Sequence, residues 1–205
     1  MNTSRIVLVS LLCAALGAGS AAGQGKTGEK GQMPDMQEMM KKWQEVMTPG
    51  APHKQLQEMV GTWDVETKAW MAGPGTEPSV TKGTAQMKMV LGGRFLQQEM
   101  NSEMMGMPFS GMGLTGYDNF KKKYVGFWID NMSTGMSTME GEMDGDGKTC
   151  TYWGVMDEPM TGEKGKKVKY TLTMDGPDRH IFRAFDVAIY GEKDPTLEIT
   201  YTRSK

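Results

Sequence analysis

The chain has 205 residues, with 23 Lys and Arg against 25 Asp and Glu, and a formal net charge of −2. Charges of both signs are mixed along the chain without a basic block, so the sequence does not favour a nucleic-acid partner. The length is that of one domain, which is enough for a single hydrophobic core.

The N-terminus has the pattern of a signal peptide. Residues 6–16 (IVLVSLLCAAL) are apolar, and small residues follow at 17–23. The apolar run has roughly half of the ~20 residues that a membrane-spanning helix needs. We therefore predict a signal peptide over residues 1–23, no stable membrane insertion, and a periplasmic or secreted protein. A lipoprotein anchored at Cys13 is the alternative, but Leu12 is larger than the small residue expected before a lipidated cysteine.

Removal of the signal peptide would leave Cys150 as the only cysteine. An intramolecular disulfide is then impossible. The neighbours of Cys150 are typical of a strand, which favours a buried apolar role over a reactive thiol.

Two segments precede the main domain. Residues 24–32 (QGKTGEKGQ) are polar and glycine-rich, which predicts a flexible leader. Residues 33–59 are predicted to be helical, because methionines and Trp43 recur every three or four positions between 33 and 47. We expect this apolar stripe to be buried against the rest of the protein or across its opening.

Residues 60–205 change to a period of two, which is typical of β-strands. Apolar and polar residues alternate in VKYTLTM and in LEITYTR, and glycine-rich turns separate many of the segments. Ten strands are predicted, over residues 63–71, 83–91, 94–105, 109–117, 123–130, 135–143, 148–156, 168–174, 180–190 and 197–203. Because no helical pattern separates them, the sequence predicts an all-β, antiparallel, up-and-down barrel.

The two ends of this domain resemble lipocalin and calycin barrels. Those barrels carry Gly-x-Trp on the first strand and a basic residue on the last strand that lies over the Trp ring. Gly61, Trp63 and Arg203 match this pattern. The resemblance implies that Arg203 closes one end of the barrel by a cation–π contact with Trp63.

A wider resemblance covers residues 33–203. The phrases HKQLQEMVGTWDV, MVLGGRFLQQE, MGMPFSGMGLTGYDNFKKKYVGFWIDNMSTG and LEITYTR resemble the secreted bacterial domain-of-unknown-function family 1579. This resemblance implies a calycin-like barrel and no established activity.

The segment YVGFWIDNMSTG contains the candidate ligand site. Tyr124, Trp128 and Asp130 share one strand face, and Arg94 on the third strand could pair with the Asp130 carboxylate. If this face points into the barrel, it would provide an apolar wall with a polar end. The alternative is a purely structural ion pair between Arg94 and Asp130.

Methionine is unusually frequent, with 22 residues. Thioethers bind Cu(I), so a copper site at Met36, Met39 and Met40 is an alternative to packing. Haem ligation by His180 is a further alternative that we do not favour, because a histidine next to Arg179 in a turn is typically solvated.

The sequence thus favours an exported, non-enzymatic protein that binds a small apolar or amphipathic molecule in a β-barrel. A methionine-rich copper binder is the second hypothesis, and an enzyme of unknown reaction is the third. No known catalytic motif supports an enzyme. The sequence does not indicate the oligomeric state.

Overall fold

The computed structural model of the protein describes residues 35–159 and 161–205. The predicted signal peptide (1–23) and leader (24–32) lie outside the described residues, as do the first two residues of the predicted helical segment.

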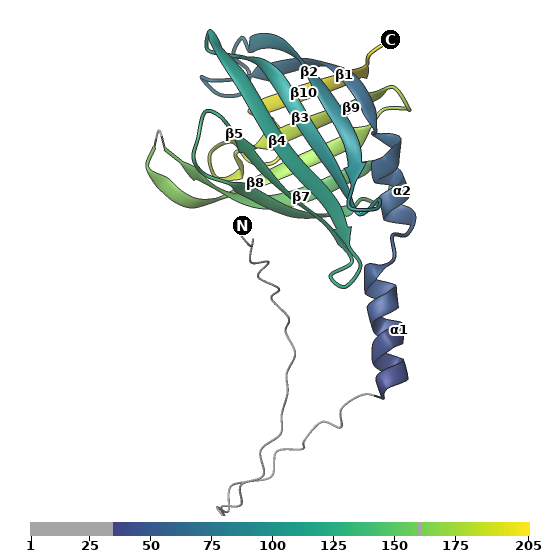
Figure 1. The fold of residues 1–205 in the computed structure, drawn as a ribbon. Helices are drawn as coiled ribbons and strands as arrows, with labels where there is room; N and C mark the ends of the chain where they lie inside the picture. The colour runs from purple at the N-terminus through teal and green to yellow at the C-terminus, as the bar shows by residue number, and fades with distance from the viewer. Residues whose placement is uncertain (1–34, 160) are drawn as a thin grey trace, which may run out of the picture. The chain divides into compact units, whose positions relative to one another are not determined.

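Ten strands form one closed antiparallel barrel (Figure 1). Each strand pairs with its neighbours in the chain, and the first strand also pairs with the last. The strands are β1 (Gly61–Ala69), β2 (Ser79–Val90), β3 (Phe95–Met104), β4 (Met107–Asp118), β5 (Lys123–Asp130), β6 (Ser137–Met143), β7 (Thr149–Glu158), β8 (Glu163–Met174), β9 (Arg179–Phe185) and β10 (Leu197–Arg203). The predicted fold class is confirmed.

Alternation along the strands decides which side chains fill the barrel. On β2, Ala85 and Met87 are buried, whereas the intervening Gln86 and Lys88 are exposed. The register between β1 and β10 places Trp63 opposite Arg203, so residues of the same face meet across the seam. The period of two in the sequence therefore corresponds to an apolar interior and a polar exterior.

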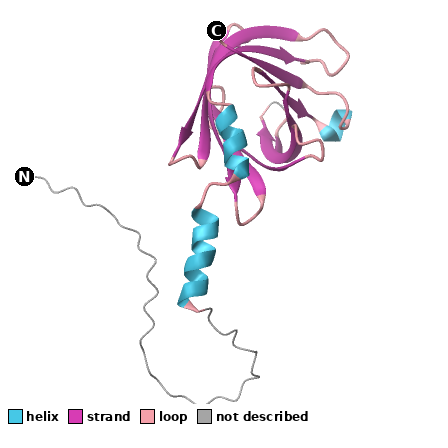
Figure 2. Cartoon of the chain, turned by 90° about the vertical axis from the view of Figure 1, so that its right-hand side faces the viewer, coloured by secondary structure: helices cyan, strands magenta, loops and turns pink. Residues whose placement is uncertain are grey.

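Helix α2 (Ala51–Glu58) contacts β2, β3 and β4 at one end of the barrel, which we call the closed end (Figure 2). It begins after Gly50 and has Pro52 in its first turn, where a proline costs no hydrogen bond. Its buried residues His53 and Leu56 point into the fold. The opposite end of the barrel, where β3, β5 and β7 finish, is called the open end.

A short helix, α3 (Val187–Tyr190), occupies part of the segment predicted as the ninth strand. Strand β9 ends at Phe185, and the Asp186 side chain then accepts a hydrogen bond from the Ile189 backbone N–H at 3.3 Å. This side-chain cap turns the chain into a helix, so the predicted strand over 180–190 is too long.

Helix α1 (Met36–Met47) has no buried residue. Met36, Met40 and Trp43 are 67%, 63% and 61% exposed, so the expectation that this stripe is buried is wrong. The contacts of α1 with the barrel involve backbone carbonyls of its last turn instead: the Asn119 amide donates hydrogen bonds to the carbonyls of Glu45 and Val46. Within the described residues, no helix is long and apolar enough to cross a membrane.

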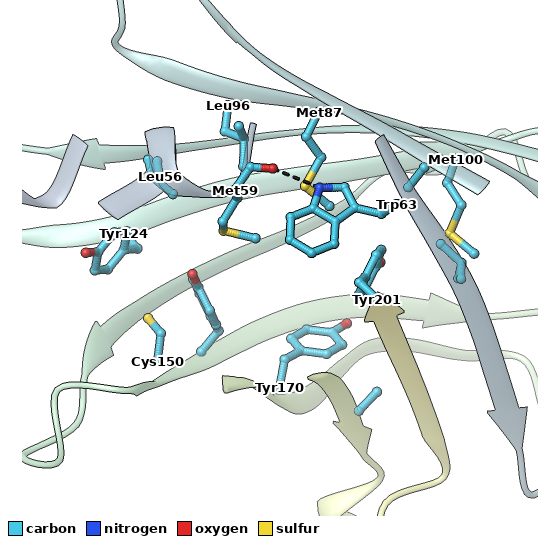
Figure 3. Packing of buried hydrophobic residues seen from close by; sticks show 14 of the residues in the cluster. Leu56, Met59, Trp63, Met87, Leu96, Met100, Tyr124, Cys150, Tyr170 and Tyr201 are labelled. Atoms are coloured by element: carbon cyan, nitrogen blue, oxygen red, sulfur yellow. Dashed lines mark hydrogen bonds between the residues drawn. The ribbon is translucent and has the colours of Figure 1, made fainter. Parts of the chain in front are cut away.

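Buried apolar residues cluster around Trp63 (Figure 3). Trp63 and Met87 are almost fully enclosed, and Leu56 and Met59 pack onto them from α2 and the turn after it. The Trp63 indole N–H donates a 2.9 Å hydrogen bond to the Met59 carbonyl. This bond satisfies the one polar atom of the ring and attaches the helical segment to the barrel.

Candidate functional site

Arg203 closes the barrel at the α2 end. Its guanidinium carbon lies 4.2 Å from the centre of the Trp63 ring, as the sequence predicted. It also donates hydrogen bonds to the carbonyls of Val60 at 2.9 Å and Glu58 at 3.0 Å. Gly61 has a φ of 142°, and a Cβ there would lie 2.6 Å from Arg203 Nη1. The glycine two residues before Trp63 is therefore favoured by its φ, which other residues rarely adopt, and by the guanidinium that passes beside it.

His180 lies behind this closure and is only 2% exposed. Its ring is 4.4 Å from Trp63 in an edge-on arrangement and 4.4 Å from Tyr201 in a stacked one. Burial, with a smaller effect of the Arg203 charge, lowers the pKa of His180 to about 4. The expectation that His180 is solvated in a turn is wrong, because it is the first inward-facing residue of β9.

This position bears on the haem hypothesis. The Nε2 atom of His180 is buried and has no hydrogen-bond partner in the described part of the chain. Because Nε2 is buried, a haem iron would reach this nitrogen only if neighbouring side chains moved. The arrangement does not fit an axial haem ligand.

A cavity of about 510 Å³ runs through the barrel. Its floor includes Leu56 and Met59, and it extends to residues of the open end such as Met104, which is 41% exposed. Most of the wall is apolar, and it includes Leu96, Met100, Phe109, Val168, Leu172 and Ile199. The volume lies within the range of roughly 300–1,000 Å³ that is typical of small-molecule sites.

Trp128 and Asp130 both line this cavity and are both half-buried. They come from the end of β5, and their side chains are joined by a 3.1 Å hydrogen bond from the indole N–H to Asp130 Oδ2. Asp130 Oδ1 accepts a second bond, from the Met132 backbone N–H, at 3.0 Å. The two residues that the sequence placed on one inward face therefore form a single polar unit on the cavity wall.

Two glycines of β4 make room for the Trp128 ring. Gly111 and Gly113 are opposite Asp130 and Trp128 in the register of the sheet. A Cβ at Gly111 would lie 2.2 Å from Trp128 Cζ2, and one at Gly113 would lie 2.9 Å from Cε3. The ring thus packs directly onto the backbone of β4. This pairing was not predicted, although the alternate glycines of FSGMGLTG in the sequence are a signal for it.

Tyr124 and Arg94 lie elsewhere. Tyr124 is buried near the closed end, where its hydroxyl donates a 2.5 Å hydrogen bond to Gln55 Oε1, and burial raises its pKa to about 12. Arg94 lies in the turn before β3 and donates to the carbonyls of Leu91 at 3.1 Å and Met47 at 2.7 Å. Neither belongs to the wall of the cavity.

The expected pairing of Arg94 with Asp130 is wrong in both of its forms, as a ligand site and as a structural ion pair. Strands β3 and β5 run in the same direction, and Arg94 precedes the first whereas Asp130 ends the second. The two charges are therefore at opposite ends of the barrel.

A second polar group, which was not predicted from the sequence, lies at the open end. Lys166 is 7% exposed, lines the cavity, and forms a short ion pair with Asp186. The hydrogen bond to Asp186 raises the pKa of Lys166. The signal for an inward lysine was its position, because Lys166, Val168 and Tyr170 alternate on one strand face.

The candidate copper ligands Met36, Met39 and Met40 lie together on α1, and two of them are largely exposed. Many other methionines are dispersed over the interior instead, including Met87, Met100, Met139 and Met156. No group of three or more His, Cys, Asp and Glu residues that could hold a metal occurs in residues 35–159 and 161–205.

Cys150 is 3% exposed, and burial raises the pKa of its thiol to about 12. Its predicted position as a buried strand residue is confirmed. Such a thiol is held in the protonated, unreactive form.

The fold and the cavity together define a closed antiparallel β-barrel with an interior cavity of ligand size. The chain belongs to the family described as "Protein of unknown function (DUF1579)", whose sequence profile matches residues 48–203. Comparison with curated proteins gave no match.

Among solved structures, the chain is similar to Rv2717c from M. tuberculosis, with a TM-score of 0.53 and 14% identity over 77% of this chain and 100% of that one. It also matches a redesigned β-barrel, mFAP1, bound to DFHBI, with a TM-score of 0.35 and 15% identity over 72% of this chain and 97% of that one. At such low identity, the similarity to Rv2717c shows the fold alone.

Proposed function

We propose that this protein is an exported binding protein that holds a small apolar or amphipathic molecule inside its barrel. The observation that carries the proposal is the cavity of about 510 Å³ with apolar walls. Closely packed interiors seldom leave a void of this size, because empty apolar space costs stability. A ligand would recover that loss by filling the cavity.

The polarity of the wall supports an amphipathic occupant. The floor is formed by apolar side chains such as Leu56 and Met59, whereas Asp130, Glu158 and Lys166 contribute charged groups to the wall. Sites of this kind hold the apolar part of a ligand by burial and orient it through a few polar contacts.

Binding without chemical transformation agrees with the state of the reactive side chains. Burial and the Arg203 charge keep His180 neutral, and the Nδ1 atom of His53 accepts a hydrogen bond from the Gly50 N–H. The Cys150 thiol is protonated. None of these groups has the exposed, activated form that general-base or nucleophilic catalysis requires. Export is proposed from the apolar run and small residues of 6–23.

The proposal can be tested with the neutral fluorescent probe N-phenyl-1-naphthylamine, titrated into the protein. We expect a saturable, one-site rise in probe fluorescence, because the probe would leave water for the apolar cavity. Met156→Trp should reduce this binding at least about tenfold, since the larger side chain would occupy the cavity.

Val155→Trp is the matched control. Val155 is the neighbour of Met156 on β7, faces outward and is 50% exposed. It should leave probe binding unchanged. Absence of saturable binding, or equal loss in both variants with the fold intact by circular dichroism, would refute the proposal. If the probe binds as expected, native mass spectrometry of protein from its own host would identify a retained molecule.

A further inference from the structure

Trp128 is held in place on the cavity wall by two independent constraints. Its indole N–H is bonded to Asp130 Oδ2, and its ring packs onto the backbone at Gly111 and Gly113. A side chain fixed in this way offers the same surface to any molecule in the cavity. Among aromatic side chains, the indole attracts cations most strongly, by roughly 0.5–2 kcal/mol.

Asp130 places a carboxylate beside this ring. Its two oxygens accept hydrogen bonds from neutral donors, the Trp128 indole N–H and the Met132 backbone N–H. No Lys or Arg forms an ion pair with Asp130 in the part of the chain that the structure describes. Among residues 35–159 and 161–205 the carboxylate therefore has no ionic partner, although it lines a cavity and is half-buried.

The other charged groups on the cavity wall are mostly acidic as well. Glu103, Glu158 and Asp186 are acidic, and Lys166 is the one Lys or Arg among the described lining residues. The Lys166 ammonium is already bonded to Asp186 and lies 3.9 Å from Glu163. An anionic headgroup at this end would be repelled by several carboxylates, and the lysine that could attract it is already paired with Asp186. The charges of the wall therefore favour a cationic headgroup over an anionic one.

We propose that the Trp128–Asp130 pair is a subsite for a positively charged headgroup, so that the ligand of the barrel is an amine- or ammonium-bearing amphiphile. The apolar tail would lie along the wall toward Leu56 and Met59, and the cation would rest against the indole ring within reach of the carboxylate. This inference rests on the proposed function, because it specifies the chemical class of the molecule in the same cavity.

The test compares three probes that share a decyl chain and differ in headgroup charge: decyltrimethylammonium, decyl sulfate and decanol. Each is titrated by isothermal calorimetry below its micelle concentration and at low ionic strength, where charge effects are least screened. We expect the ammonium probe to bind at least about tenfold more tightly than the sulfate. Asp130→Asn should reduce this ratio to within about threefold.

Asp157→Asn is the control for general charge effects. Asp157 follows Met156 at the same end of the barrel, is exposed, and accepts a hydrogen bond from the Gly165 backbone N–H, as Asp130 does from Met132. It should leave the ratio unchanged. A second variant, Trp128→Leu, should also reduce the ammonium preference.

The outcomes separate this inference from the proposed function. If decanol binds but the two charged probes bind equally, or the sulfate binds more tightly, the cationic subsite is refuted and the binding barrel stands. A ratio that Asp130→Asn leaves unchanged would refute it too. If none of the three probes binds, the proposed function fails and the subsite fails with it.

Discussion

Replacement of Arg203 by alanine should destabilise the domain by about 3 kcal/mol. The guanidinium lies 4.2 Å from the Trp63 ring, which contributes about 1 kcal/mol at a partly exposed site. Its hydrogen bond to the half-buried Val60 carbonyl contributes about 2 kcal/mol, because the donor is charged. The bonds to Glu58 and the ion pair with the exposed Asp178 are accessible to water, which can replace them, so they add little.

The assay is thermal and urea unfolding of the wild type and the variant. For a domain of this length, about 3 kcal/mol corresponds to a decrease in Tm of about 6–12 °C. Arg179→Ala is the matched control, because Arg179 forms an exposed ion pair with Asp175 and should change stability by less than about 0.5 kcal/mol. If Arg203→Ala costs less than about 1 kcal/mol, or no more than the control, then Arg203 does not close the barrel in the way described.

Three further predictions concern other parts of the molecule. Gly111→Ala should displace the Trp128 ring, which would shift the tryptophan fluorescence, and it should weaken binding of the fluorescent probe. Gly145→Ala is the control and should have no effect, because a Cβ at Gly145 would meet no atom within 4 Å. His180 titrates near 6.5 when unfolded and about 4 when folded, so the unfolded state binds more protons between these values. The free energy of unfolding should therefore decrease by about 3 kcal/mol as the pH falls through this window, and His180→Phe should remove that part of the pH dependence in urea titrations; parallel curves would contradict it. In a Cu(I) titration against a strong chelator we expect no stoichiometric binding. Stoichiometric binding that is lost when leucine replaces Met36, Met39 and Met40 would instead support the copper site.

The strands were predictable from sequence because their periodicity has a direct physical cause. A residue such as Met87 must face the interior if Ala85 does, since alternate side chains of a strand point to the same face. The contact of Trp63 with Arg203 was predictable from the resemblance to calycin barrels, and the register of β1 and β10 accounts for it.

The partners of apolar and charged faces were harder to predict. The periodicity of α1 defines an apolar stripe that includes Met36 and Met40, but no periodicity says what covers it, and the structure leaves it exposed. The proposed pairing of Arg94 with Asp130 could have been rejected from the predicted topology. In an up-and-down barrel the third and fifth strands are parallel in direction, so the start of one and the end of the other cannot meet.

The packing around Trp128 could be predicted only in part, because the residue pattern of one strand does not show which residues lie opposite it on the next strand. The alternate residues of β5 identify Trp128 and Asp130 as inward neighbours. Only the register between β4 and β5 shows that Gly111 and Gly113 lie beneath the ring. Such cross-strand information depends on turn geometry as well as on the alternation of residues.

The seam between β1 and β10 makes completion of the fold depend on the last strand of the barrel. β10 occupies residues Leu197–Arg203, and a bond such as that from Arg203 to Val60 joins residues 143 positions apart. A chain that stops before Leu197 would leave β1 and β9 as unpaired edges, which are open to aggregation or proteolysis. Contacts so distant in sequence also form slowly. The barrel therefore cannot close until Leu197–Arg203 has been made, and a protein that we propose to be exported would lack a closed barrel until that point.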